Sequence, residues 1–148
     1  MNIETKFLGE VTIEESEIIT FENGLPGFSE QTKYVLLGLD ADLPIALLQS
    51  TEERDLGFVV VYPFAFKKDY AFDLSEEDKS ELKLAEEADV AVYTILTLKE
   101  NFAESTMNLL APIILNTKEK LGKQIVLNDN AQYPLRHQIG VVAEGSVK

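Results

Sequence analysis

The sequence contains no cysteine and no tryptophan, and it has a single histidine, His137. Without cysteine there can be no disulfide, no thiolate metal site and no cysteine nucleophile. A lone histidine without cysteine partners is a poor start for a metal site, so we expect neither a catalytic nor a ligand role for His137. The GxGxxG, GxxxxGK[ST] and GxSxG signatures are also absent. The sequence therefore predicts no catalytic residue, no metal ion and no cofactor.

Long apolar runs and calcium loops are missing as well. No stretch approaches the roughly 20 apolar residues of a membrane-spanning helix. The N-terminal residues MNIETKFLGE lack the basic and then apolar layout of a secretory signal, so we expect a cytoplasmic protein. Residues 40–42 (DAD) and 128–130 (NDN) lack the following glycine and distal glutamate of a calcium loop, and we interpret both as turns.

Positive charge is scarce. The chain has 13 lysines and arginines against 26 aspartates and glutamates, a net charge of −13. Residues 69–90, called the acidic segment below, contain nine acidic and two basic side chains and carry −7 of that charge. Such a surface repels phosphate, which argues against direct binding of nucleic acid, and it attracts a basic protein. The alternative is that the acidic segment is a solvated face that keeps the protein soluble.

The patterning favours a mainly β fold. Short apolar or alternating runs bounded by turn residues predict strands, at 3–7, 11–13, 18–21, 34–39, 45–48, 57–62 and 90–98. Residues 113–115 and 125–127 predict a hairpin joined by residues 116–123. Ser75 before three acids predicts a helix that ends near Leu84 or Ala88, and residues 101–110 predict a second short helix.

These elements predict one domain. We expect residues 1–140 to form a small antiparallel sheet that closes into a barrel-like fold or folds over as a sandwich. Residues 141–148 are small and polar, and we expect a flexible C-terminal tail. We also expect a monomer.

The stretch FENGLPGF, residues 21–28, combines apolar residues with a rigid turn. Pro26 sets φ for the second position of a type II turn, and Gly27 accepts the positive φ of the third position. Leu25 and Phe28 would then stand at the corners of the turn. Two interpretations stay open: the corners fold inward and plug one end of a barrel, or they form part of a docking surface.

The chain resembles the FliW family of flagellar assembly factors. The resemblance rests on FENGLPGF, LQS followed by FVVVYP, TMNLLAPIILN, and GKQIVL followed by YPLR, which occur in this order within residues 21–136. It implies a small, mainly antiparallel, barrel-like fold and a binding protein rather than an enzyme. It also implies two cytoplasmic partners that compete with each other, flagellin and the basic RNA-binding regulator CsrA, whose repression of flagellin translation would be relieved on capture.

Given these implied partners, two groups of residues are candidate binding sites. Carboxylates beside the RNA groove of CsrA would repel phosphate without covering the groove; the candidates are Asp69, Asp73, Glu76, Glu77 and Asp78. An amphipathic flagellin helix would need apolar walls; the candidates are the turn Leu25, Pro26, Gly27 and Phe28 together with Phe64, Phe66, Tyr70 and Phe72. The alternative for the aromatic residues is core packing.

Other functions remain open at this point. An acidic adaptor domain with a different protein partner is the second hypothesis. An enzyme, such as a barrel that acts on carbohydrate, is the third, and a deep polar cleft with paired carboxylates would support it. For Asn108 and Asn116 we expect a structural role, in which the amides satisfy buried backbone groups near Pro112.

Overall fold

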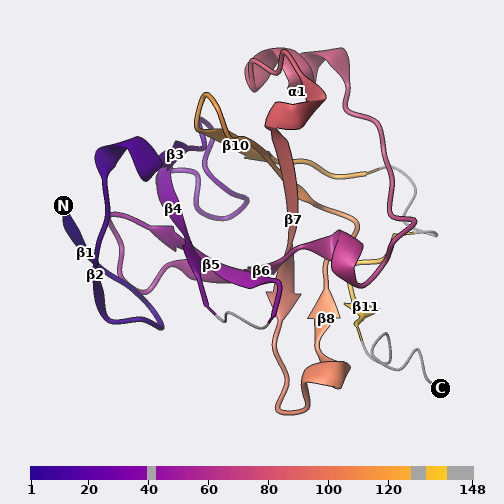
Figure 1. The fold of residues 1–148 in the computed structure, drawn as a ribbon, viewed down its shortest axis with the longest axis horizontal. Helices are drawn as coiled ribbons and strands as arrows, with labels where there is room; N and C mark the ends of the chain where they lie inside the picture. The colour runs from indigo at the N-terminus through magenta and orange to yellow at the C-terminus, as the bar shows by residue number, and fades with distance from the viewer. Residues whose placement is uncertain (40–42, 128–132, 140–148) are drawn as a thin grey trace.

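The computed structural model describes residues 1–39, 43–127 and 133–139 (Figure 1). The strands in these residues are β1 (Asn2–Glu4), β2 (Glu10–Thr12), β3 (Ile19–Thr20), β4 (Lys33–Gly38), β5 (Ile45–Ser50), β6 (Gly57–Val61), β7 (Val90–Thr97), β8 (Thr106–Met107), β9 (Ile113–Asn116), β10 (Leu121–Gln124) and β11 (His137–Gln138). One α-helix, α1 (Glu76–Glu81), and the short 3-10 helices η1 (Glu15–Glu17), η2 (Pro63–Ala65), η3 (Glu87–Asp89) and η4 (Phe102–Glu104) complete the described elements. The residues 40–42 and 128–130 and the expected tail lie outside the described residues.

Seven strands close into a ring. Strand β7 pairs with β6, and the order continues through β5, β4, β3, β10 and β9 until β9 pairs back with β7. All of these pairings are antiparallel except that of β3 with β10. The ring confirms the mainly β, barrel-like expectation, because closure removes the unpaired edges that a flat sheet would leave.

Alternation along the strands sorts the side chains between two faces. On β4, Tyr34 and Leu36 pack inside the ring, whereas Val35 and Leu37 pack outside against the β1–β2 hairpin. The period of two in a strand requires this division. The inner core is therefore shared by several strands, and its fully buried members include Phe21, Tyr34, Leu48, Val60 and Ile113.

Two further segments of the chain pack on the outer face of the ring. The chain from η2 to α1 runs along one side of the molecule (Figure 1) and buries Tyr70 against Leu109 and Met107. The Tyr70 hydroxyl donates to the Leu109 carbonyl at 2.6 Å. Beyond α1, Leu82 packs on Ile114 and Ile125. Both segments bury apolar surface that the ring alone would expose.

Three predicted elements differ from the structure. The first helix begins after Ser75 as expected but ends at Glu81, because Lys83 adopts φ 55 and Leu82 turns into the core. The predicted helix at 101–110 is wrong. Only η4 is helical there, and residues Thr106–Met107 form β8, whose Met107 is opposite Leu96 of β7. Pairing with β7 outweighs the local helical spacing in this stretch.

A hairpin follows β9 as predicted, but the prediction of its second strand at residues 125–127 is wrong, because β10 lies at residues 121–124, within the predicted loop. Strand β10 pairs with β9 from Leu121 opposite Asn116 to Gln124 opposite Ile113, so the connecting loop is short. Lys120, at φ 57, makes the tight reversal possible. Residues 125–127 continue beside the segment that precedes β9, where the Ile125 amide donates to the Pro112 carbonyl at 3.0 Å.

Candidate partner-binding surface

The 25–28 turn divides its two apolar corners between core and solvent. The Phe28 amide donates to the Leu25 carbonyl at 2.7 Å, and Gly27 has φ 87, as a type II turn requires. Leu25 is 2 % exposed and packs inside the ring, whereas Phe28 is 42 % exposed and meets Phe58 edge-on at 5.8 Å. Leu25 therefore faces inward, as the first interpretation expects, and Phe28 faces outward, so the docking interpretation stays a prediction for Phe28.

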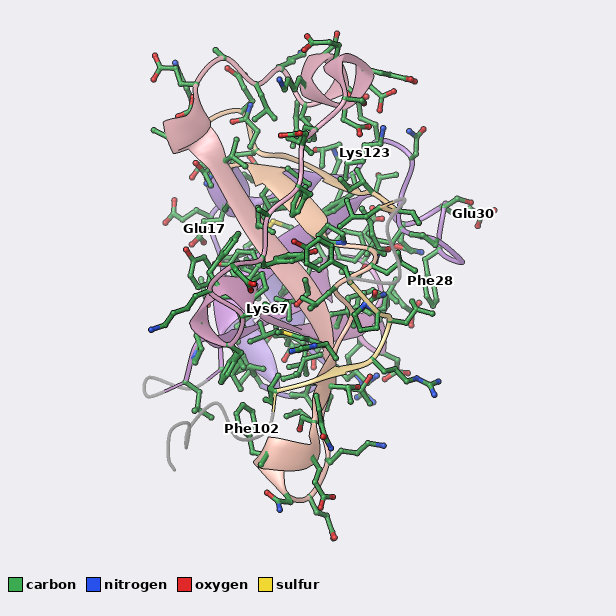
Figure 2. All side chains as sticks on the ribbon, turned by 90° about the vertical axis from the view of Figure 1, so that its right-hand side faces the viewer. Glu17, Phe28, Glu30, Lys67, Phe102 and Lys123 are labelled. Atoms are coloured by element: carbon green, nitrogen blue, oxygen red, sulfur yellow. The ribbon has the colours of Figure 1, made fainter. Side chains whose placement is uncertain are left out.

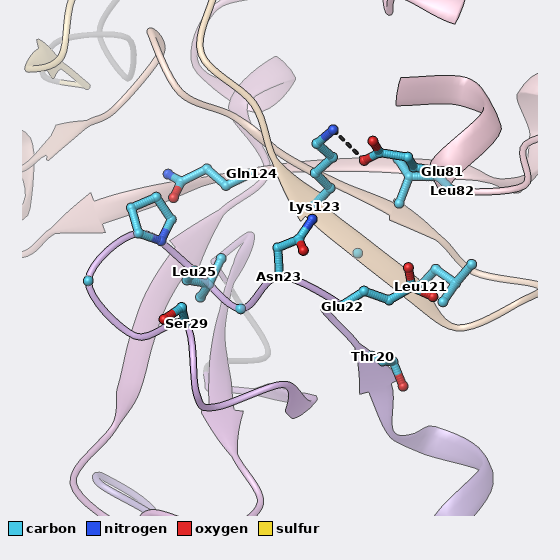
Figure 3. Close-up of a pocket in the computed structure, with 14 residues that line it drawn as sticks. Thr20, Glu22, Asn23, Leu25, Ser29, Glu81, Leu82, Leu121, Lys123 and Gln124 are labelled. Atoms are coloured by element: carbon cyan, nitrogen blue, oxygen red, sulfur yellow. Dashed lines mark hydrogen bonds and ion pairs between the residues drawn. The ribbon is translucent and has the colours of Figure 1, made fainter. Parts of the chain in front are cut away.

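The turn borders a hollow of about 250 Å³ (Figure 3). Residues 22–27 and Ser29 form one wall, β10 and Thr20 form the base, and the C-terminal end of α1 forms the far rim. The lining residues are Thr20, Glu22, Asn23, Gly24, Leu25, Pro26, Gly27, Ser29, Glu81, Leu82, Leu121, Gly122, Lys123 and Gln124. The hollow thus brings the turn next to the acidic segment, a proximity that sequence reasoning did not predict.

Lys123 of β10 connects α1 to the ring through two ion pairs. Its Nζ atom lies 2.6 Å from Asp78 Oδ1 and 2.6 Å from Glu81 Oε1. The Ser75 hydroxyl accepts from the Asp78 amide at 3.0 Å and caps α1. The hydrogen bond from Lys123 holds the pKa of the Asp78 carboxyl below its usual value, and the two carboxylates raise the pKa of Lys123.

The five predicted acidic residues differ in whether they already form an ion pair within the protein. Asp78 is occupied by Lys123, and Asp69 lies 2.8 Å from Lys67, whose hydrogen bond lowers the pKa of the Asp69 carboxyl. Glu76 makes a long, exposed contact of 3.5 Å with Lys79. Two of the five, Asp73 and Glu77, are exposed and form no ion pair with any residue that the structure describes. The carboxylates most available to a partner are therefore those at positions 73, 76 and 77.

Asp78→Asn is expected to lower the free energy of unfolding by about 1 kcal/mol at pH 7, because the half-buried ion pair with Lys123 is lost. The pKa of Asp78 is depressed in the folded state, so its contribution is present above the unfolded pKa of about 3.9 and disappears as the pH falls through the folded value. Urea denaturation at pH 7 and near pH 2 measures both effects.

The matched control is Asp69→Asn, which removes an exposed partner and is expected to change stability very little. A deficit in Asp78→Asn that stayed the same size near pH 2 would show that packing, and not the ion pair, causes the loss.

The predicted aromatic residues form a row of touching rings. Ring centroids are 5.2 Å apart for Tyr62 and Phe64, 5.8 Å for Phe64 and Tyr70, and 5.3 Å for Tyr70 and Phe72. Tyr70 is 2 % exposed, so it supports the surface from below, while Phe64 and Phe72 are half-buried. Tyr62, which was not among the candidates, is 45 % exposed. We call Tyr62, Phe64, Tyr70 and Phe72 the aromatic row.

The turn and most of the aromatic row pack on different core clusters. Phe66, the remaining aromatic candidate, packs on Phe102 at 6.1 Å, beyond the row. Figure 2 shows Phe28 near one edge of the molecule and Lys67, which follows Phe66, well away from it. The inner core beneath Phe28 and the outer core beneath the row are separate clusters. A partner that used both would have to span the ring.

His137 is half-buried in β11 opposite Met107, and its burial lowers its pKa, with a further lowering by Lys67. Among the described residues, no group of three or more His, Asp or Glu side chains is placed to hold a metal ion. The helical segments in the described part of the chain are all too short to span a lipid bilayer.

Comparisons of this chain with a family model, with related sequences and with a solved structure agree on one protein family. The family model described as "FliW protein" matches residues 2–139. A flagellar assembly factor FliW of Bacillus subtilis (strain 168) is 48% identical over 140 residues, which cover 95% of this chain and 97% of that protein. A flagellar assembly factor FliW of Exiguobacterium sp. is 47% identical over 140 residues, 95% of each chain. The crystal structure of a flagellar assembly factor FliW superposes with a TM-score of 0.87 at 39% identity, covering 95% of this chain and 97% of the other.

Proposed function

The chain belongs to the FliW family of flagellar assembly factors, and on that premise we propose that it acts by binding two proteins in turn, flagellin and CsrA. Both partners compete for it in the cytoplasm. While flagellin accumulates it occupies the protein, and once flagellin is secreted the freed protein captures CsrA and relieves the repression of flagellin translation. The protein works as a monomer that catalyses no reaction.

The observation that carries this proposal is the set of exposed carboxylates on and just before α1. Asp73, Glu76 and Glu77 are exposed, and the ion pair that they form with the described residues is the long contact of 3.5 Å between Glu76 and Lys79. Excess negative charge on and just before a capped helix attracts a basic RNA-binding protein and repels RNA. The same negative charge therefore attracts CsrA and repels the RNA that CsrA would otherwise bind.

Charge repulsion of this kind does not require the protein to cover the RNA groove of CsrA. At 10 Å and an effective dielectric constant of about 40 to 80, one pair of like charges costs about 0.4 to 0.8 kcal/mol before screening. Three carboxylates facing several phosphates reach a few kcal/mol, which corresponds to a loss of RNA affinity of about 10- to 100-fold. CsrA and RNA would then exclude each other without occupying the same site.

Flagellin binding would use the apolar surface. We expect its helical terminal region to contact Phe28 on one side, or the outer rings of the aromatic row, where Phe64 and Phe72 are half-buried. Leu25 and Tyr70 are buried and shape these surfaces without facing the partner. Pro26 and Gly27 are exposed beside Phe28 and hold it in place.

The test uses the full chain, purified CsrA, purified flagellin and a labelled flagellin leader RNA. We expect the chain to bind each protein at micromolar concentration or below, to release RNA from CsrA, and to lose CsrA when flagellin is added. Failure to bind either protein would favour an adaptor with a different partner. Turnover of a carbohydrate or another metabolite would favour an enzyme.

The triple variant Asp73→Asn, Glu76→Gln and Glu77→Gln is expected to weaken CsrA binding about 10-fold and to flatten its dependence on salt, because three attractive charges are removed. Isothermal titration calorimetry between about 50 and 300 mM salt measures both changes.

The control triple Glu10→Gln, Glu15→Gln and Glu52→Gln removes the same charge from exposed positions on β2, η1 and the loop after β5. It is expected to keep nearly the full affinity. Equal losses in the two triples would mean that total charge, and not the acidic segment, attracts CsrA.

A further inference from the structure

We propose that the hollow between the 25–28 turn and β10 is a socket for one arginine side chain of the basic protein partner. The inference rests on the proposed function for the identity of that partner. It concerns residues other than the carboxylates at positions 73, 76 and 77, and it assigns a ligand chemistry to a site lined by Glu22, Asn23 and Gln124.

The base of the hollow is an open strand edge. Strand β10 pairs with β3 at a single position, Leu121 opposite Thr20, where the Thr20 amide donates to the Lys120 carbonyl at 2.9 Å, and β3 ends at Thr20. The amides of Ile125 and Leu127 donate to the carbonyls of Pro112 and Leu110, on the β9 side. Alternation along the strand therefore points the carbonyls of Gly122 and Gln124 to the opposite side, where no described strand pairs with them.

The side chains around this edge add further acceptors. The Gln124 amide nitrogen donates to the Ala111 carbonyl at 2.9 Å, which leaves its Oε1 atom as an acceptor. Asn23 is exposed at the hollow, and its side chain forms no hydrogen bond with the described residues (Figure 3). Glu22 lies in the same wall as an exposed carboxylate without an ion pair in the described part of the chain.

The cation that lines the hollow is already neutralised. Lys123 lies 2.6 Å from both Asp78 and Glu81, so its ammonium group is shared by two carboxylates. With Glu22 added, the charged groups at the hollow and its rim carry more negative than positive charge. An anionic ligand is excluded on this ground, and a cationic ligand is favoured.

Arginine fits this arrangement better than lysine. Its planar guanidinium carries five N–H donors, and the wall (Glu22, Asn23) and the neighbouring strand β10 (the Gly122 carbonyl) offer acceptors, while Gln124 lies at the other end of the hollow (Figure 3). Leu25, Pro26, Leu82 and Leu121 also line the hollow and offer apolar surface to the aliphatic stem. The volume of about 250 Å³ holds one such side chain and not a folded element.

The first experiment tests the socket without any partner protein. The full ¹⁵N-labelled chain is titrated with Nα-acetyl-arginine amide, with the neutral analogue Nα-acetyl-citrulline amide and with Nα-acetyl-lysine amide. We expect saturable amide shifts at residues 23–27 and 122–124 with the arginine probe, at least threefold weaker binding of lysine, and no saturation with citrulline. Citrulline shifts equal to those of arginine would overturn the socket.

Two variants test where on the protein the arginine probe binds. Glu22→Gln is expected to weaken binding of the arginine probe at least threefold, while Glu30→Gln, which changes the same charge in the same loop outside the hollow, leaves it unchanged. Equal effects of the two variants would contradict the assignment. Both positions are exposed, so loss of folding is not expected, and the dispersion of the amide spectrum checks this directly.

The second experiment connects the socket to the partner. CsrA affinity is expected to fall at least threefold in Glu22→Gln and to stay at the parent value in Glu30→Gln. Unchanged affinity in Glu22→Gln would overturn the role of the socket in capture while the proposed function stands. If the unmodified chain does not bind CsrA at all, the proposed function fails, and the arginine titration still decides whether the socket exists.

Discussion

Gly24→Ala is expected to lower the free energy of unfolding by about 3 kcal/mol. Gly24 has φ 67, and a Cβ atom there would lie 2.5 Å from the Phe28 carbonyl oxygen and 2.6 Å from Ser29 Cα. Both obstacles are backbone atoms, so the 25–28 turn itself would have to move. Chemical denaturation measures the loss.

Gly27→Ala is the matched control for this change. Gly27 also has a positive φ, 87, but a Cβ atom built there meets nothing within 4 Å. The expected cost is therefore the backbone strain alone, about 1 kcal/mol. If the two variants lost the same stability, the close approach at Gly24 would contribute nothing and the turn would be looser than its geometry indicates.

Asn116→Ala is expected to cost about 3 kcal/mol, because it leaves several buried or half-buried backbone groups without partners. Asn116 is 2 % exposed. Its Nδ2 donates to the carbonyls of Leu82 at 2.7 Å and Lys83 at 3.1 Å, and its Oδ1 accepts from the amides of Lys118 at 2.9 Å and Glu119 at 3.0 Å. One amide thus joins the end of α1 to the β9–β10 loop.

Asn108→Ala provides the comparison. The Asn108 Oδ1 accepts one bond, from the Ala111 amide at 3.0 Å, and the side chain is only half-buried. A loss of about 1 kcal/mol is expected. In both variants the melting of α1 can be followed by hydrogen exchange, and the Asn116 variant should expose the amide of Leu82 first. Equal stability losses in the two variants would contradict the bridging role of Asn116.

The structural role expected for these two asparagines is confirmed, although the reason differs at one of them. Asn108 serves the backbone next to Pro112, as expected. Asn116 serves the end of α1, which is 33 and 34 residues away in the chain. Sequence proximity suggested the first contact, and only the fold could supply the second.

Gln49 is another residue whose contacts could not be predicted from its neighbours in the sequence. It lies in the LQS stretch that resembles the family, but its sequence context does not reveal its partners. In the structure it is fully buried, its Nε2 donates to carbonyls of the β5–β6 loop, and its Oε1 accepts from the Lys6 amide at 2.9 Å. A single amide connects the N-terminal hairpin to the ring.

Local chemistry by itself determined the approximate positions of β1 to β7 and β9, the turn at Pro26 and Gly27, the capped start of α1 and the position of the acidic segment. Alternation, φ preference, helix capping and charge are properties of neighbouring residues, so they can be read directly along the chain. The same reasoning placed Thr106 and Met107 in a helix, because their pairing with β7 depends on residues nine and eleven positions away.

Only the tertiary structure decided which of these features meet. Closure of the ring through β7 and β9 brings β10 beside the 25–28 turn, and Lys123 then draws α1 to the same place. Leu25 packs in the inner core, and Phe28 packs edge-on against Phe58. Such contacts depend on strand order and register, which no short stretch of the sequence encodes.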